Sequence, residues 1–404
     1  MDGSGGRYIG AIPGRRPPAA GRDGDDASRS AHLFVVSLPL VRKLLTLCCL
    51  ALVGCGGSGT GGVVRFGAAG PWNEAYGAMN RRGVELAYDE IKARADYAKH
   101  PFEISWQNDQ ADGQKATAIA TDFVADPSVV AVIGHVNSGT EVAAAPVYNA
   151  GHLVSVATTA TSPALTGISP WVFRVISSDS MNGLHMAQFA GARLGKHRAA
   201  VLYENNAYGR GLADAFRRNF SGTVVAFDPI AEGAQNFEPY VSYLKTLNPD
   251  LVFVAGTDAS GASFLREFRR QKLTATLLGG DGWTSLSVDT TLAEGIYVGA
   301  PFSAENPDAE VQKFVQDFRA KYHLTPDGNA ALAYDATNLL YDALTRVGPD
   351  RAKIRDFLAG LTPQTAWKGV TGNIYFGASG DPVGKSVVMT RLHDGALQVV
   401  EGTP

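Results

Sequence analysis

The sequence predicts an α/β protein built from stacked βαβ units around two parallel sheets. From residue 63 onward, short β-branched runs alternate with longer amphipathic stretches, as strands alternate with helices in such folds. The alternation breaks near residues 174–179 and then resumes, which implies a second sheet. The chain has 404 residues, of which 45% are hydrophobic, and this is enough for one large or two medium cores.

The first half of the pattern contains three strand and helix pairs. In each pair, a run rich in Val, Ile or Phe precedes a stretch in which apolar residues recur at helical spacing. The expected pairs are 63–66 with 79–99, 102–106 with 113–125, and 129–133 with 140–150, followed by strands over 152–156 and 171–176. The polar residues 177–180 then mark the end of this half.

The second half repeats the plan and then changes it. The expected pairs are 199–203 with 209–220, 223–227 with 237–247, and 251–255 with 261–271, and further strands begin at Leu277 and cover 296–298. After residue 302 the expected order is three helices, 311–322, 329–346 and 351–361, and then two strands, 373–376 and 386–392. Helices without intervening strands are typical of a cover on a sheet already built.

Residues 41–55 have the features of an export signal. Arg42 and Lys43 precede an apolar run over 44–54, which is too short to span a bilayer as a helix and fits a secretory signal. Leu52-Val53-Gly54-Cys55 resembles the lipobox of bacterial lipoproteins, in which the cysteine becomes the N-terminus and carries the lipid. The alternative is a buried N-terminal strand with incidental cysteines.

These features divide the N-terminal region into three parts. We expect residues 1–40 to be a disordered leader or an over-extended gene start, 41–54 a lipoprotein signal peptide, and 55–62 a flexible Gly/Ser/Thr tether behind the lipid anchor at Cys55. The three cysteines are Cys48, Cys49 and Cys55. Because none lies further along, no disulfide framework or cysteine metal site is expected there.

Charge and motif searches exclude several classes of function. The net charge of −3 offers no basic field for nucleic acid, and removal of residues 1–54 leaves 29 Lys and Arg against 35 Asp and Glu, or −6. The sequence contains no P-loop, no H-E-x-x-H and no G-x-S-x-G. We therefore expect no enzyme, no metal and no cofactor. His135, directly after an apolar strand, is expected to be a hydrogen-bonded core histidine rather than a ligand or base.

Three polar groups follow predicted strands and could hold a zwitterion. Asp281 lies between glycines at a strand's carboxyl end, where open α/β sheets bind ligands. Ser138 follows another strand and opens a helix, a position that favours a carboxylate, although a plain Ser cap would look the same. The hydroxyl-rich segment 158–162 ends the next strand. An acid and hydroxyls together suit an amino-acid-like ligand.

At this point the chain resembles the type I periplasmic binding proteins of ABC transporters, specifically the leucine/isoleucine/valine-binding group. The segments that carry the resemblance are residues 131–138, 160–165, 173–179, 208–212 and 279–282, in the family's order and spacing. The resemblance implies two Rossmann-like lobes joined by three hinge crossings, with the ligand in the cleft between them. It implies lobe 1 over 63–178 and 302–376, and lobe 2 over 179–301 and 377–404.

The resemblance also implies roles for individual residues. Ser138 and Thr161 would bind the ligand carboxylate with nearby backbone amides, and Ala160 belongs to the same set. The Thr159 carbonyl and Asp281 would hold the ammonium group. Tyr208 would come from the opposite lobe as the cleft closes, and Tyr76 would line the side-chain pocket. Trp72 and Trp283 are further candidates.

The sequence departs from the family pattern at three positions. The acid at the ammonium position is Asp281 where the family usually has Glu, and Thr257-Asp258 replaces an aromatic residue. A small disulfide near the cleft is absent, with Asn137 in one of its places. The residues expected to bind the α-carboxylate and α-ammonium groups are thus better preserved than those expected to select a branched aliphatic side chain. Asp258 could favour a polar or cationic side chain, or could be a helix N-cap.

The function expected from these residues and this resemblance is that of a monomeric, lipid-anchored, extracytoplasmic substrate-binding protein. It would bind an amino acid of branched-chain type, or a related small polar solute, by cleft closure and deliver it to an ABC permease in the membrane. Two alternatives remain: a ligand-sensing module of the same fold, and binding of an amide, urea or an aromatic acid. An enzyme is disfavoured because the cleft candidates include no nucleophile with its base.

Overall fold

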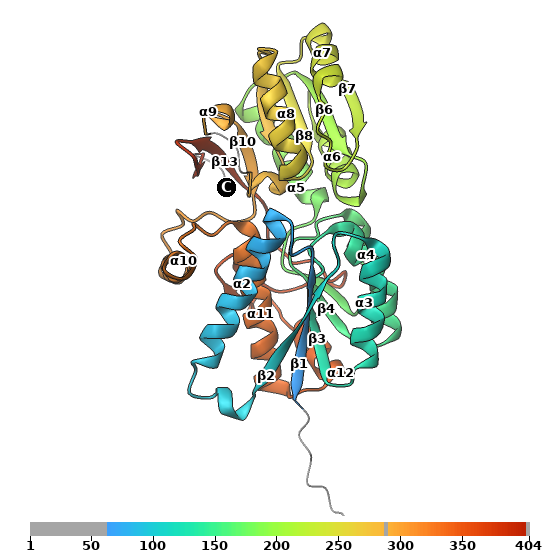
Figure 1. Ribbon diagram of the computed structural model, residues 1–404, viewed down its shortest axis with the longest axis vertical. Coiled ribbons are helices and arrows are strands. Elements are labelled where there is room, and N and C mark those ends of the chain that lie inside the picture. Colours follow the sequence, from blue (N-terminus) through green and yellow to red (C-terminus); the bar gives the residue numbers. More distant parts are fainter. Residues whose placement is uncertain (1–62, 287–289, 401–404) are drawn as a thin grey trace, which may run out of the picture. The chain divides into compact units, whose positions relative to one another are not determined.

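The computed structural model describes residues 63–286 and 290–400, and two parallel sheets with helices on both faces dominate it (Figure 1). One sheet has five strands in the order β2-β1-β3-β4-β5, and the other has seven in the order β14-β13-β10-β9-β8-β6-β7. The predicted α/β class with a second sheet is therefore confirmed. We call the elements around the five-stranded sheet the first lobe and those around the seven-stranded sheet the second lobe.

The first lobe is built on strands that, apart from the edge strand β2, are buried along most of their length. Its strands are β1 (Val64–Gly70), β2 (Phe102–Asn108), β3 (Val129–Ile133), β4 (Val154–Ala157) and β5 (Val172–Arg174), and its helices are α2 (Ala75–Lys92), α3 (Gly113–Ala125), α4 (Ser138–Ala150), α10 (Ala309–Tyr322), α11 (Gly328–Val347) and α12 (Arg351–Ala359). All four strand pairings are parallel. Burial on both faces explains why β3 reads as a continuous apolar run.

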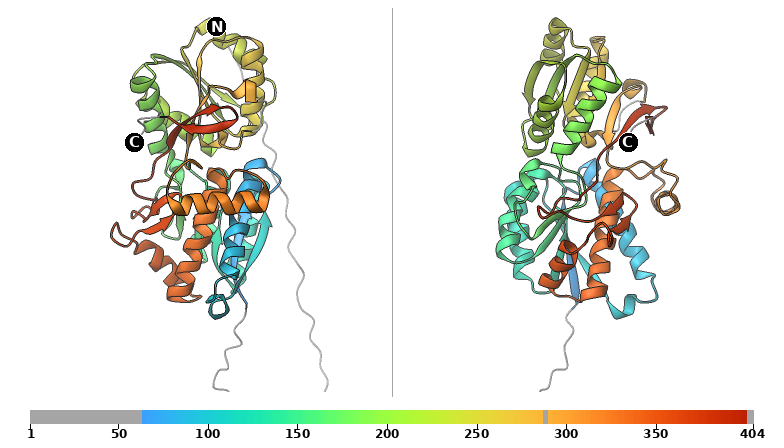
Figure 2. Two further views of the ribbon diagram at one scale, coloured as in Figure 1. Left: turned by 90° about the vertical axis from the view of Figure 1, so that its left-hand side faces the viewer. Right: turned by 180° about the vertical axis from the view of Figure 1, so that it is seen from behind.

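The second lobe repeats this plan with an antiparallel edge. Its strands are β6 (Arg198–Glu204), β7 (Thr223–Ile230), β8 (Leu251–Ala255), β9 (Thr276–Gly279), β10 (Tyr297–Ala300), β13 (Val388–His393) and β14 (Ala396–Val399), and its helices are α5 (Asp179–Gln188), α6 (Ala207–Asn219), α7 (Glu238–Leu247), α8 (Asp258–Arg270) and α9 (Thr290–Ala293). Strands β13 and β14, drawn in red, pair antiparallel beside β10 (Figure 2).

The chain passes between the two sheets three times, as expected. It leaves the first lobe after β5, returns after β10, and leaves again before β13. The third passage begins after residue 380, because residues 379 and 380 still bond to the first lobe: the Ser379 carbonyl accepts from the Gly167 N–H, and the Gly380 carbonyl accepts from the Arg174 N–H. The buried Lys385 ammonium donates to the Val175 carbonyl at 2.9 Å, so the first and third passages are tied together.

The late helices cover the first sheet, as their position in the sequence indicated. Helix α11 packs along α2, and its side chains join the core that contains Phe66 and Phe102. The two helices approach closely at Gly83, where an added Cβ would lie 2.1 Å from the Ala330 carbonyl oxygen. Small strands β11 (Trp367–Gly369) and β12 (Gly372–Ile374) form a separate hairpin.

Several predicted boundaries are wrong by a few residues. The helix expected over 79–99 runs from Ala75 to Lys92, and residues 97–99 form a separate 3₁₀ turn. Helices α4 and α8 begin two and three residues earlier than expected, at Ser138 and Asp258. In both, the prediction excluded a polar or glycine-containing first turn that the structure includes.

The leader, the signal segment, Cys55 and the tether all lie outside the described residues. No helix in the described part is long and apolar enough to cross a membrane.

Candidate functional site

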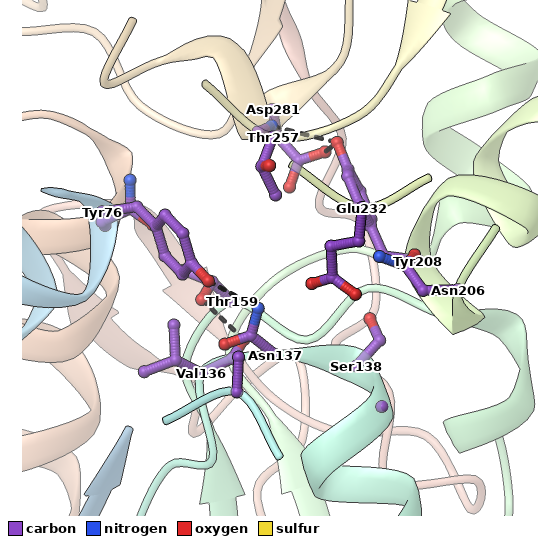
Figure 3. Close-up of a pocket in the computed structure, with 14 residues that line it drawn as sticks. Tyr76, Val136, Asn137, Ser138, Thr159, Asn206, Tyr208, Glu232, Thr257 and Asp281 are labelled. Atoms are coloured by element: carbon purple, nitrogen blue, oxygen red, sulfur yellow. Dashed lines mark hydrogen bonds between the residues drawn. The ribbon is translucent and has the colours of Figure 1, made fainter. Parts of the chain in front are cut away.

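One pocket collects residues from the carboxyl ends of strands in both sheets (Figure 3). It is lined by Tyr76, Ala111, Val136, Asn137, Ser138, Gly139, Thr159, Asn206, Tyr208, Glu232, Thr257, Asp281, Gly282 and Asn329. The strand order reverses between β1 and β3 in the first sheet and between β6 and β8 in the second. The loops after these four strands therefore open a crevice at each sheet edge, which is where α/β sheets bind ligands.

The chemistry of this pocket distinguishes it more than its size does. Its cavity volume is about 90 Å³, whereas two larger grooves of about 890 and 770 Å³ lie on the helices of the first lobe and at the chain passages. Only the small pocket, among these three in the described residues, brings together polar groups from the edges of both sheets. Convergent polar groups are the usual mark of a ligand site.

On the first-lobe side, the N-terminus of α4 faces the pocket. Ser138 is the first helical residue, and its hydroxyl accepts from the N–H groups of Thr161 and Ser162 at 3.2 and 3.1 Å. Asn137 precedes the helix without a side-chain cap bond and instead donates to the Tyr76 hydroxyl at 2.9 Å. Ser138 is therefore not a plain N-cap, and the first N–H groups of α4 remain free of helical partners.

A buried arginine holds the loop behind this helix end. Arg174 is 2% exposed, and its guanidinium lies 2.6 Å from the Asp381 carboxylate. It also donates to the Ser162 carbonyl at 2.9 Å and to the Ala160 carbonyl at 3.4 Å. These bonds fix the backbone of the segment that carries Thr161 next to the pocket.

On the second-lobe side, Asp281 and Tyr208 form a bonded pair. The Tyr208 hydroxyl donates to one Asp281 carboxylate oxygen at 3.0 Å and accepts from the Gly282 N–H at 3.0 Å. Burial raises the pKa of the Asp281 carboxyl to about 6, although the bond from Tyr208 lowers it. A carboxylate that is held in place and poorly solvated is prepared to bind a cation.

A second acid, which the sequence reasoning did not select, lies behind this pair. Asp179 is fully buried, and its N–H donates to the Thr161 carbonyl at 2.9 Å. Burial raises the pKa of the Asp179 carboxyl well above its usual range, and the negative charge of Asp281 raises it further. The neutral form of Asp179 is thus favoured, and the negative charge on this side of the pocket resides on Asp281.

Four further polar residues line the pocket and were missed or undervalued. Asn206 and Glu232 follow strands β6 and β7, Thr257 follows β8, and Asn329 lies in the first turn of α11. Their common signal is a position at a strand's carboxyl end or a helix start. The sequence reasoning applied this signal to β3, β4 and β9, and it considered residues 257–258 after β8 only through the family resemblance. Thr257 is itself held by Glu204, whose carboxylate accepts from the Thr257 hydroxyl at 2.8 Å.

The structure brings five of the seven predicted binding residues into the pocket lining. Tyr76, Ser138, Thr159, Tyr208 and Asp281 line it, whereas Ala160 and Thr161 are fully buried beside it. Ser138, Thr159 and Tyr76 belong to the first lobe, and Tyr208 and Asp281 to the second. Whether any of them binds a ligand stays a prediction.

Three other residues considered from the sequence, Asp258, Trp283 and Trp72, have structural positions. The N-cap of α8 is Thr257, so the prediction of Asp258 as the cap is wrong by one residue. Trp283 is 1% exposed and packs against glycines 261 and 279 in the core, and Trp72 packs edge-on against Trp106. Neither tryptophan lines the pocket, because each is used to fill space between strands and helices.

His135 is a core histidine, as expected. It is completely buried, and its two ring nitrogens lie 2.7 Å from an Asp109 oxygen and 2.9 Å from the Tyr148 hydroxyl. Its N–H donates to Glu141 at 2.5 Å. Burial raises the pKa of the Glu141 carboxyl to about 7. This network lies directly under the loop that leads to Ser138.

With this geometry in place, comparison with known proteins defines the class. Residues 66–396 match the family model described as a periplasmic binding protein, and the chain belongs to this family, whose members bind solutes and are not enzymes. Several similar proteins carry the name Leu/Ile/Val-binding protein homolog.

The individual relatives are similar over nearly their whole length. The Leu/Ile/Val-binding protein homolog 2 of Brucella abortus is 26% identical over 361 residues, which cover 86% of this chain and 95% of that protein. The LivJ substrate-binding protein of Streptococcus pneumoniae, solved with isoleucine, has a TM-score of 0.78 at 25% identity over 84% of this chain and 99% of its own. A Desulfitobacterium hafniense ABC transporter substrate-binding protein, solved with Leu, has a TM-score of 0.71 at 29% identity over 84% and 100%.

Proposed function

We propose that this chain is the substrate-binding protein of an ABC importer and that it binds an α-amino acid by closure of its two lobes. The observation that carries this proposal is the division of the pocket: a helix N-terminus with Ser138 on the first lobe, and the Asp281–Tyr208 pair on the second. One side suits an anion and the other suits a cation. An α-amino acid presents both charges on neighbouring atoms.

In the proposed complex, the first lobe holds the ligand carboxylate. The N–H groups at the start of α4 have no helical partner, and the helix dipole favours negative charge at this end. The Ser138 hydroxyl proton is available to donate, since the oxygen already accepts from Thr161 and Ser162. Thr161 would position the Ser138 hydroxyl through its own N–H, which donates to it, and Arg174 holds the neighbouring Ala160 and Ser162 carbonyls.

The second lobe would hold the ligand ammonium. Asp281 accepts one of its protons, and the Thr159 carbonyl on the first lobe accepts another, so the ammonium group joins the lobes. A ligand that contacts both lobes favours the closed state, and this population shift presents a docking surface to the permease. Relatives solved with isoleucine and with Leu support this chemistry.

The first experiment is a binding screen on residues 58–404. Thermal shift and calorimetry against α-amino acids, amides, urea and aromatic acids should give responses confined to α-amino acids, with about 2.7 kcal/mol of stabilisation at 100 times the dissociation constant. Ser138→Ala should weaken binding without changing the fold, which circular dichroism checks. A response confined to amides or plain acids would contradict the zwitterion site.

We further propose that Cys55 carries a lipid that anchors the chain outside the cytoplasm, where it acts as a monomer. The support is the signal-like segment 41–54 and the lipobox-like residues before Cys55. Expression with a radiolabelled fatty acid should label the full chain but not its Cys55→Ser variant. Label retained in the variant would contradict the anchor. Membrane fractionation and light scattering then test the location and the oligomeric state.

A further inference from the structure

The part of the pocket that remains for a ligand side chain is polar and acidic. Besides the groups assigned to the α-carboxylate and α-ammonium, its lining includes Asn137, Asn206, Glu232, Thr257 and Asn329. Figure 3 shows the Glu232 side chain extending into the pocket toward the first-lobe residues Asn137 and Ser138. In the described ranges 63–286 and 290–400, no lysine or arginine lines this pocket.

Glu232 is exposed to solvent in the pocket, and no lysine or arginine shares the pocket lining with it. The largest influences on the pKa of the Glu232 carboxyl are burial, which raises it, a bond from Asn206, which lowers it, and the charges of Glu204 and Glu74, which raise it. Burial is the main cause that raises the pKa of the Tyr76 hydroxyl, and the charges of Glu74, Glu232 and Asp258 raise it further. These acids therefore lie close enough to repel one another around the pocket.

An aliphatic side chain fits this arrangement poorly. On closure, an isobutyl or sec-butyl group would remove water from the Glu232 carboxylate and from neighbouring amides without replacing their hydrogen bonds. Loss of solvation without a partner is costly, most of all for a charged group. A side chain that ends in a cation would instead donate to Glu232 and offset the charges around it.

We propose that the ligand is an α-amino acid with a cationic side chain, whose terminal ammonium or guanidinium group donates to Glu232 beside Asn206. This inference rests on the proposed function, because it assumes that the α-carboxylate and α-ammonium bind at Ser138 and Asp281. Glu232 is a specificity-determining residue in this arrangement, and it lies on a different strand connection from Asp281. Its loss should therefore change the choice of side chain and not the recognition of the α-amino acid frame.

Calorimetry with side chains that differ only in their end group tests the proposal. Lysine and norleucine share a four-carbon chain, and only lysine carries the amine; ornithine, arginine, glutamine and leucine complete the set. We expect lysine, ornithine or arginine to bind at least about 30-fold more tightly than norleucine or leucine. Tighter binding of norleucine, leucine or glutamine than of every cationic ligand would overturn the proposal.

Paired variants separate the side-chain role from a general effect of charge. Glu232→Gln should lower the affinity for the cationic ligand by about 30-fold and change that for norleucine by less than about threefold. Glu238→Gln, an exposed acid of the same lobe outside the pocket, should leave both unchanged. An unchanged cationic preference in Glu232→Gln contradicts the role of Glu232. If no α-amino acid binds the unmodified protein, the proposed function fails with it, whereas binding of aliphatic amino acids alone removes only this inference.

Discussion

At the scale of single residues, Asp281 is in an environment that makes its charged form less favourable than it would be in water. Burial raises its pKa to about 6, and the buried Asp179 lies close enough for the two acids to affect each other. The bonds from Tyr208 and Gly282 then hold Tyr208 and Asp281 in one orientation. Such a residue favours ligand binding at the expense of the stability of the ligand-free fold.

Replacement of Asp281 by Asn should therefore have opposite effects on stability and on binding. Asp281→Asn keeps the acceptor for Tyr208 but removes the charge, so the free energy of unfolding of the ligand-free protein at pH 7.5 should rise by about 1 kcal/mol. Binding should weaken by about 2–5 kcal/mol, because the ligand ammonium loses its partner. Urea denaturation and calorimetry measure the two quantities. Unchanged affinity would show that Asp281 does not hold the ammonium.

The Tyr208 hydroxyl should matter for binding more than for folding. Tyr208→Phe removes the donor that orients Asp281 and leaves the Gly282 N–H without its acceptor. The expected loss of affinity is about tenfold, with the same ligand preference, as measured by calorimetry. A change in ligand preference with no loss of affinity would indicate that Tyr208 contacts the side chain instead.

At the scale of elements, the first lobe depends on the close approach of α2 and α11. An added Cβ at Gly83 would meet the Ala330 carbonyl oxygen at 2.1 Å, inside any van der Waals distance. The contact joins a helix near the start of the described chain to one near its end, so the lobe cannot form before both are present. Only glycine at position 83 lets the two helix backbones approach this closely.

A glycine pair tests this packing. Gly83→Ala should destabilise the protein by about 2–4 kcal/mol, because a backbone shift is needed to relieve the overlap. Gly139→Ala is the matched control: Gly139 is also in a helix, and an added Cβ there meets nothing within 4 Å. Chemical denaturation should find the control within about 0.5 kcal/mol of the unmodified protein. Equal effects of both substitutions would refute the packing argument.

The sequence predicted which helices and strands form better than where they begin and end. It also predicted some of the residues that line the pocket, but not all of them. Strands β3 and β8 are as expected because burial on both faces leaves a continuous apolar run. The start of α8 was missed, since its first turn, Asp258-Ala259-Ser260, is polar and gives no periodic signal. Ser138 and Asp281 could be selected from motifs beside strands. Glu232 follows β7 in the same way but was not selected, because its loop carries no motif and reaches the pocket only through the pairing of β7 with β6.

At the scale of the whole molecule, several buried carboxyl groups couple the stability of the fold to pH. Burial raises the pKa of Glu141 to about 7 and those of Asp258 and Asp281 to about 6. Between the pKa of the unfolded chain, near 4, and these values, the folded protein binds more protons than the unfolded one. Its stability therefore falls as the pH rises through this window.

The ligand-free protein should accordingly be more stable at pH 5.5 than at pH 8. The expected difference in the free energy of unfolding is on the order of 1–3 kcal/mol, and urea denaturation at the two pH values measures it. Asp258→Asn should reduce the difference, since it removes one of the raised groups. Lys385 does not offset this trend. Burial lowers its pKa to about 8, so it changes the stability only at pH values above about 8. Equal stability at both pH values would contradict the linkage.

The division of the pocket between two lobes has a consequence for which molecules can be transported. A fragment with only a carboxylate can occupy the first lobe, and an amine can occupy the second, yet neither joins Ser138 to Asp281. Such fragments would compete for the pocket without producing the state that the permease accepts. Under the proposed function, the protein would therefore select its ligand twice: once by binding in the pocket, and again by whether the bound molecule carries both charged groups at the spacing that closes the lobes.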